Sequence, residues 1–111
     1  MGMKKYSRAH DFPQAVRGVV ARIRKGAVLS YADVAKRAGF PGAARAVGSL
    51  MRKNHDPRIP CHRVIRSCGR IGAYNRGGEE GKANLLKREG VLLESRTSAG
   101  KSTWSVSRRE S

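Results

Sequence analysis

Two short helical patterns joined by Gly39–Pro41 restrict the architecture of this chain more than any other segment does. The first pattern begins at Ser30, which with Asp33 three positions later has the arrangement of a helix N-terminus. The second opens at the linker proline and carries apolar residues at helical spacing through Met51. Short helices on either side of a glycine-containing turn are typical of a helix-turn-helix motif.

The spacing of apolar residues predicts another helix before this motif, over roughly residues 12–24. Asp11 and Gln14 are in the right positions to form a capping box at its start. Lys25 and Gly26 would end it, because a basic last turn followed by glycine is a helix stop signal.

The C-terminal part of the chain is predicted to hold a last helix and a hairpin. The helix covers residues 79–89, with an inward face made of Ala83, Leu85 and Leu86. Residues 91–93 and 103–106 are the expected strands, and residues 98–100 the expected turn. The predicted fold class is therefore mainly α with a small β hairpin.

A chain of 111 residues is expected to form one domain with a modest core. We predict that this domain spans residues 12–107. Residues 1–11 would form a basic N-terminal arm, and residues 108–111 a basic tail.

The charge of the chain is strongly positive. It has 24 Lys and Arg against 8 Asp and Glu, a formal net charge of +16 and a pI of about 11.3. A domain pI above ~9 is a usual mark of nucleic-acid binding; solubility alone is the competing explanation. A basic membrane-surface protein fits less well, because no window has a long apolar face opposite a Lys/Arg face.

The sequence carries no signal peptide and no apolar run near the ~20 residues that a membrane span needs. Its two cysteines, Cys61 and Cys68, do not make a disulfide framework. We therefore expect the cytoplasm with its nucleoid, or the nucleus, rather than secretion.

The second helix of the motif is predicted to have two different faces. Ala43, Val47 and Leu50 share the face toward the core. The opposite face is cationic and low in profile, with Arg45, Ser49, Arg52 and the small Gly48. Such a face suits close approach to a nucleic-acid groove, although an ordinary solvated helix face would have a similar composition.

The loop-like segment from residue 54 to residue 78 contains Pro60-Cys61-His62-Arg63. Loops on a rigid scaffold often carry catalytic groups. The thiolate is the reactive form of cysteine, and neighbouring cations favour it. The tetrad thus indicates a nucleophilic cysteine, although a buried, inert cysteine is the simpler alternative. A zinc site fails, because Cys61, His62 and Cys68 supply three poorly spaced ligands where a structural site wants four. No metal and no cofactor are expected.

The same residues resemble the O6-alkylguanine-DNA alkyltransferase family. Pro60-Cys61-His62-Arg63-Val64 is similar to its active-site signature, and Ala43–Gly48 to its recognition-helix motif. Ser30-Tyr31, Asn54 and the segment from Leu85 to Gly90 follow in the family's order, so the resemblance covers roughly residues 12–93. It implies a winged-helix-like helix-turn-helix domain, expected to be monomeric. The domain would bind double-stranded DNA by the minor groove and flip out the alkylated guanine.

The resemblance also implies a role for each matching residue at the reacting centre. Cys61 would take the alkyl group irreversibly, His62 would act as its base through a bridging water, and Glu89 would orient His62. Asn54 would brace the surrounding loops. The plainer alternatives are a structural hydrogen bond for His62 and a surface ion pair for Glu89.

The remaining positions would hold the DNA and the flipped base. Tyr31 would lie by the flipped nucleotide, and Arg45 would fill the space that the base leaves, unless it only contacts a phosphate. The other expected DNA contacts are Ala44, Gly48, Ser49 and Arg52. The expected pocket residues are Pro60, Val64 through its carbonyl group, Tyr74, Asn75 and Arg76.

The chain departs from the family pattern in two ways. Few residues precede the first helix, whereas full-length alkyltransferases usually carry a further N-terminal domain. This short architecture resembles the alkyltransferase-like proteins, which usually replace the reactive cysteine, yet Cys61 is kept. The loop of residues 74–78 is also one residue longer than usual, with Asn75 and Arg76 in place of a single small residue.

These features leave three functional hypotheses. The first is a single-turnover DNA repair methyltransferase acting on O6-alkylguanine. The second is a non-enzymatic alkyltransferase-like sensor that binds the lesion and recruits other repair proteins. The third, a sequence-specific helix-turn-helix regulator, is disfavoured because Ala44-Arg45-Ala46 offers few groups to read base edges.

Overall fold

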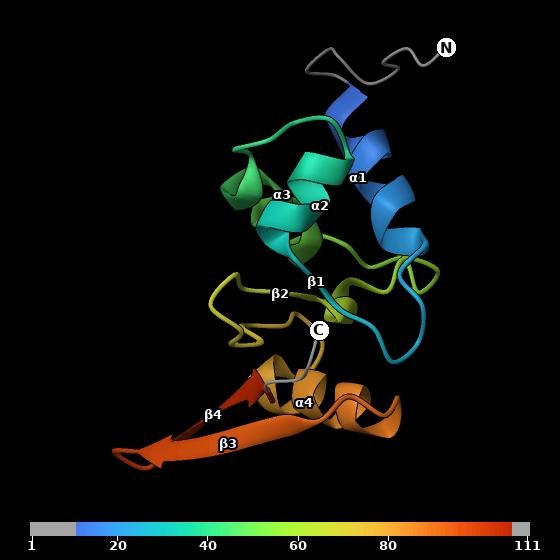
Figure 1. Cartoon of the computed structure of the whole chain (residues 1–111). Helices are drawn as coiled ribbons and strands as arrows, with labels where there is room; N and C mark the ends of the chain where they lie inside the picture. The colour runs from blue at the N-terminus through green and yellow to red at the C-terminus, as the bar shows by residue number, and fades with distance from the viewer. Residues whose placement is uncertain (1–10, 108–111) are drawn as a thin grey trace.

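The computed structural model describes residues 11–107. Within these residues the chain begins with three helices and ends with a helix and a hairpin, and two short strands join the two parts (Figure 1). The elements are α1 (Phe12–Ala21), β1 (Leu29–Ser30), α2 (Tyr31–Arg37), α3 (Ala44–Arg52), a 3₁₀ turn (Cys61–Arg63), β2 (Val64–Ile65), α4 (Gly78–Arg88), β3 (Leu93–Ser98) and β4 (Lys101–Val106). The N-terminal arm before Asp11 and the tail at 108–111 lie outside the described residues.

The predicted helix-turn-helix is confirmed as α2 and α3. The Ser30 hydroxyl accepts a hydrogen bond from the Asp33 backbone N–H at 3.0 Å, which caps α2. Gly39 has a φ of +93°, so the chain leaves the helix there without the strain of a side chain. The helix α3 begins at Ala44 rather than at the predicted Pro41, because Gly42 also has a positive φ, of +91°.

The predicted capping box at the start of α1 is wrong. The side chain of Asp11 makes no capping hydrogen bond, and its backbone is helical rather than extended, with φ −90° and ψ −8°. Pro13 in the first turn has no N–H to offer a capping group. The helix also ends at Ala21, earlier than the predicted residue 24.

Two short strands were missed by the sequence reading. β1 and β2 pair in parallel, with Leu29 opposite Val64 and Ser30 opposite Ile65. Each is two residues long, which is too short for an alternating pattern. This pairing joins the start of α2 to the segment that follows the Cys61 turn.

The predicted terminal hairpin is confirmed, with a shifted first strand. β3 and β4 pair antiparallel from Leu93–Val106 to Ser98–Lys101. Residues 91 and 92 were predicted to be strand but lie outside it; Val91 is buried and Leu92 is 74% exposed. The carboxylate of Glu79 accepts a hydrogen bond from the Trp104 N–H at 2.9 Å, which attaches the hairpin to α4.

The molecule has two hydrophobic clusters at opposite ends (Figure 1). The larger holds the helices α1, α2 and α3 together; its members include Val16, Val20, Val34, Ala35, Val47, Met51 and Cys61. The smaller packs α4 against the hairpin and contains Ile65, Ile71, Ala83, Leu86 and Val91. The strand pair β1–β2 lies between the two ends. Among residues 11–107, no helix has the length and apolarity to cross a membrane.

Candidate active site and DNA-binding face

Cys61 begins the 3₁₀ turn and is 6% exposed, at the wall of an open cavity of about 870 Å³. Its sulfur is a free thiol. The cavity lies between α2, α3, α4 and the loop that follows β2. Its lining residues include Tyr31, Ala44, Arg45, Gly48, Met51, Arg52, Cys61, Arg66, Cys68, Tyr74, Asn75 and Lys82. A buried thiol is thus accessible from one side to a molecule that enters this cavity.

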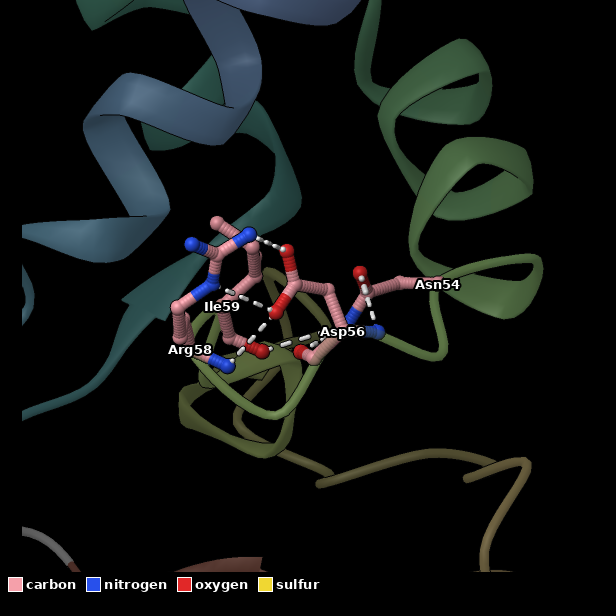
Figure 2. Close-up of polar contacts among 4 residues, drawn as sticks. All are labelled: Asn54, Asp56, Arg58 and Ile59. Atoms are coloured by element: carbon pink, nitrogen blue, oxygen red, sulfur yellow. Dashed lines mark hydrogen bonds and ion pairs between the residues drawn. The ribbon is translucent and has the colours of Figure 1, made fainter.

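Asn54 organises the loop between α3 and the Cys61 turn (Figure 2). Its side-chain amide donates to the carbonyl groups of Asp56 at 3.3 Å and Ile59 at 3.2 Å, and it contacts the Cys61 sulfur at 3.4 Å. Its own oxygen accepts from the Asp56 N–H at 3.2 Å. The residue therefore braces the loop, as expected, and also places an N–H donor on the sulfur.

Asp56 is held on the solvent side of the same loop. Its carboxylate accepts from the backbone N–H of Arg58 at 2.9 Å and from the guanidinium at 3.1 and 3.0 Å (Figure 2). These hydrogen bonds lower the pKa of Asp56 to about 2. They close the turn that leads from Asn54 toward Cys61.

His62 and Arg63 both point to Glu89, at the C-terminal end of α4. His62 Nε2 lies 2.9 Å from Glu89 Oε2, and Arg63 donates to both carboxylate oxygens at 2.9 and 2.8 Å. The carboxylate only accepts, so the shared proton is on Nε2 and Nδ1 of His62 is left as an acceptor. Glu89 is therefore part of a buried network, not of the surface ion pair that we considered as an alternative.

The charge of Glu89 is stabilised by its two partners. Burial alone would raise its pKa, but the hydrogen bonds from Arg63 and His62 outweigh burial and lower the pKa to about 2. Arg63 also donates to the Ile23 carbonyl at 2.8 Å, beyond the end of α1. The network thereby connects the turn that carries Cys61 to both ends of the fold.

Two tyrosines, Tyr31 and Tyr74, line the same cavity as the thiol. Burial raises the pKa of Tyr31, and the nearby Cys61 raises it further, while Arg52 and Arg66 oppose this change. Burial also raises the pKa of Tyr74, followed by the effect of Cys61. Both phenols therefore stay protonated at neutral pH and can donate hydrogen bonds into the cavity.

The outward face of α3 forms the cavity rim. Ala44, Arg45, Gly48 and Arg52 line it, whereas Ser49 is exposed on the same helix farther from the opening. Val47 and Met51 anchor the opposite face in the core. The predicted two-faced helix is therefore observed, with its cationic face beside the cavity that holds Cys61.

The longer loop of residues 74–78 is attached to the end of α3 by Asn75. Its side-chain amide donates to the carbonyl groups of Arg52 at 2.7 Å and Asn54 at 2.8 Å. Asn75 thus gives a partner to the Arg52 carbonyl, one of those that a helix end leaves without one, and to a carbonyl just beyond the helix. Arg76 is exposed and does not line the cavity, so the loop is fastened without filling the pocket.

Two other predicted pocket residues, Pro60 and Val64, flank the Cys61 turn in the chain and do not line the cavity. Val64 is fully buried and pairs with Leu29 in the strand that follows the Cys61 turn. Pro60 precedes the turn and is partly buried. Neither side chain lines the cavity.

The sequence reading missed Lys82, Met51, Arg66 and Cys68 as cavity residues. Lys82 was detectable in principle, because it shares the inward side of α4 with Leu86 at a spacing of four. The sequence analysis placed only Ala83, Leu85 and Leu86 on that side and made no prediction for the lysine. No cluster of three or more His, Cys, Asp or Glu side chains within residues 11–107 has a metal-binding arrangement.

A family model described as "6-O-methylguanine DNA methyltransferase, DNA binding domain" matches residues 11–91. The chain belongs to this family. The matched region contains the Cys61 turn, the Glu89 network and the helix-turn-helix.

Curated members of this methyltransferase family match the chain in part. The methylated-DNA–protein-cysteine methyltransferase of Rattus norvegicus is 53% identical over 70 residues, which are 62% of this chain and 34% of the relative. The protein of the same name from Methanothermobacter thermautotrophicus is 45% identical over 85 residues, 76% of this chain and 47% of the relative. The chain thus spans between a third and a half of these relatives.

Solved structures of family members share the fold. S. pombe Atl1, in complex with damaged DNA containing O6-carboxymethylguanine, has a TM-score of 0.75 and 30% identity; the match covers 91% of this chain and 93% of Atl1. Mycobacterium tuberculosis OGT, in complex with DNA, has a TM-score of 0.67 and 41% identity over 74% of this chain and 51% of OGT. The match to Atl1 extends over more of the chain than the match to OGT does.

Proposed function

We propose that this protein is a DNA repair methyltransferase that transfers the alkyl group of O6-alkylguanine in duplex DNA irreversibly to Cys61. The observation that carries this proposal is the position of the Cys61 thiol. It lies in an open cavity beside the cationic face of α3, with the Asn54 amide 3.4 Å from the sulfur. Family members solved with DNA, and curated relatives named methylated-DNA–protein-cysteine methyltransferase, support it.

The proposed reaction exchanges one proton for the alkyl group. His62 takes the Cys61 proton at Nδ1 through a bridging water, because its Nε2 is bound to Glu89. The sulfur electron pair then forms a bond to the alkyl carbon, and the bond from that carbon to guanine O6 breaks. The electron pair of the broken bond stays on guanine, which takes up a proton and becomes the normal base. The thioether on Cys61 is stable, so each molecule reacts once.

The face around the cavity would hold the duplex by its minor groove. Arg45 would enter the stack and fill the space of the flipped base, which offsets unstacking costs of a few kcal/mol. Ala44 and Gly48 permit close approach, and Ser49 and Arg52 would contact phosphates. The net charge of +16 makes this association strongly dependent on salt.

The flipped base would lie in the cavity against residues that line or support it. Tyr31 would donate its hydroxyl to the guanine ring, and Tyr74 would pack beside the base. The Val64 carbonyl would accept from the guanine amino group. Pro60, Asn75 and Arg76 would shape the surrounding loops. This substrate places the protein with chromosomal DNA, in a nucleoid-containing cytoplasm or in a nucleus.

Mass spectrometry of the intact protein tests the proposal. We expect incubation with a short duplex containing one O6-methylguanine to add the mass of one methylene group, mapped to Cys61. Cys68→Ser should gain the same mass, whereas Cys61→Ala and an undamaged duplex should give none. An unchanged mass with the protein still bound to the lesion would reject repair. That outcome would favour a lesion sensor that recruits other proteins.

A further inference from the structure

Lys82 is a buried charge that the proposed reaction does not yet use. It is 1% exposed and is the one fully buried charged side chain in the described part of the chain. It lies on α4 beside Ala83, where an apolar residue would be expected. Burying a lysine charge without a compensating partner costs free energy of folding.

The ammonium group of Lys82 has few partners. It donates to the Ala73 carbonyl at 3.4 Å and lies 5.8 Å from the centre of the Tyr31 ring. None of the ion pairs among residues 11–107 includes it. No carboxylate of the described residues is therefore within ion-pair distance of the ammonium group; the Glu79 carboxylate acts on it only from farther away.

Lys82 and Cys61 line the same cavity. Burial lowers the pKa of Lys82 to about 8, while Cys61 and then Glu79 favour its charged form. The ammonium is therefore the main form at pH 7. In a partly desolvated cavity, a charge acts more strongly on a developing anion than it does in water.

The basic residues next to Cys61 in the sequence are directed at Glu89 instead. His62 and Arg63 are both bound to Glu89, and neither lines the cavity. The remaining cavity cations, Arg45, Arg52 and Arg66, are exposed at the rim, where solvent screens them. The other titratable groups that line the cavity are Cys68, which is exposed, and Tyr31 and Tyr74, which are neutral at pH 7.

We propose that Lys82 is a positioning residue whose ammonium group serves as the counter-cation of the Cys61 thiolate and holds the Tyr31 ring against the cavity. The sequence suggested that His62 and Arg63 activate the sulfur. The structure instead assigns the electrostatic part of that activation to a lysine 21 positions later, on α4. This inference rests on the proposed function only in taking Cys61 as the reacting thiol.

The test measures the pH dependence of Cys61 alkylation by iodoacetamide, which needs no DNA. A Cys68→Ser background leaves Cys61 as the single cysteine. Lys82→Met removes the charge with a side chain suited to burial, and Lys87→Met, on the exposed side of α4, is the matched control. We expect Lys82→Met to move the half-maximal pH up by about one unit, which is a tenfold slower reaction at any pH below both midpoints. Lys87→Met should leave it unchanged.

A merely structural role would lower the melting temperature of Lys82→Met without moving the pH profile. An unshifted profile in Lys82→Met therefore overturns the inference. Lys82→Arg keeps the charge, and its profile should stay near that of the parent; a shift as large as that of Lys82→Met would contradict a charge effect. Should Lys82→Met fail to fold, Lys82→Gln replaces it with the same two outcomes.

The transfer reaction separates this inference from the proposed function. With alkylated duplex at pH 7, Lys82→Met should transfer about tenfold more slowly while its affinity for the duplex stays within twofold of Lys87→Met. A shifted iodoacetamide profile without any transfer in the parent protein would support the role of Lys82 and reject the proposed function. Transfer to Cys61 in the parent protein, together with an unshifted iodoacetamide profile in Lys82→Met, would support the proposed function and reject the role of Lys82.

Discussion

His62 Nε2 lies 2.9 Å from the carboxylate of Glu89, although 27 positions separate the two residues in the chain. The contact joins the turn that carries the thiol to the end of α4. It leaves Nδ1 as the one ring nitrogen of His62 that can accept a proton. Arg63 shares the same carboxylate, so the orientation of His62 depends on an ion pair as well as on a hydrogen bond.

Glu89→Gln should destabilise the protein by about 3 kcal/mol at pH 7, because it leaves the Arg63 guanidinium buried without its counter-charge. The folded-state pKa of Glu89 is lowered from 4.5 to about 2. Its contribution is therefore complete above pH 4.5 and is lost as the pH falls toward 2. Urea unfolding should show that the difference in the free energy of unfolding between wild type and Glu89→Gln is smaller at pH 3 than at pH 7. Glu94→Gln, exposed on β3, should change neither value.

Asn75→Ala should slow alkyl transfer and lower the free energy of unfolding by about 1 kcal/mol or more. It removes the hydrogen bonds to the Arg52 and Asn54 carbonyl groups, each worth roughly 0.5–1.5 kcal/mol. Single-turnover kinetics and urea unfolding measure the two effects. Arg76→Ala changes the neighbouring exposed residue and should leave stability unaltered. Equal free energies of unfolding for the two variants would show that the Asn75 hydrogen bonds do not stabilise the protein.

Gly81→Ala should displace the pocket loop. A β-carbon at this position would lie 2.9 Å from the Arg76 carbonyl oxygen, which is too close for backbone to tolerate without a shift. We expect slower alkyl transfer and a lower melting temperature, despite the better helix propensity of alanine. Gly18→Ala, in α1 with no atom within 4 Å of the added carbon, should instead stabilise by roughly 0.5–1 kcal/mol. Thermal melts of both variants provide the comparison.

Arg45→Ala and Arg52→Ala should weaken DNA binding in different ways. Loss of a phosphate contact at Arg52 should reduce the slope of log K against log salt by about 0.9 for damaged and undamaged duplex alike. Loss of Arg45, which we propose enters the duplex, should selectively reduce the preference for the alkylated duplex. Titrations at several salt concentrations distinguish the two. Arg17→Ala, exposed on α1, should have the smallest effect; an equally large effect there would indicate nonspecific attraction only.

The helix-turn-helix and the terminal hairpin could be predicted because their signals are local. Ser30 with Asp33, and the apolar spacing around Val47, lie within one or two turns of chain. The capping box predicted at Asp11 was wrong for a local reason as well. A capping pattern in the sequence does not show whether the backbone of the capping residue is extended. The two-residue strands β1 and β2 were invisible, because only their pairing across 35 positions defines them.

The candidate site residues could be named from the sequence: Cys61 and His62 from the chemistry of the Pro60–Arg63 tetrad, and Asn54 from the family resemblance. The sequence likewise determined the strong positive charge and the cationic face of α3. What surrounds the thiol was decided by the tertiary structure. Packing directs His62 and Arg63 toward Glu89 and brings Lys82 into the cavity with Cys61. Electrostatic effects act through space, so the neighbours of Cys61 in the chain could not show which cation faces its sulfur.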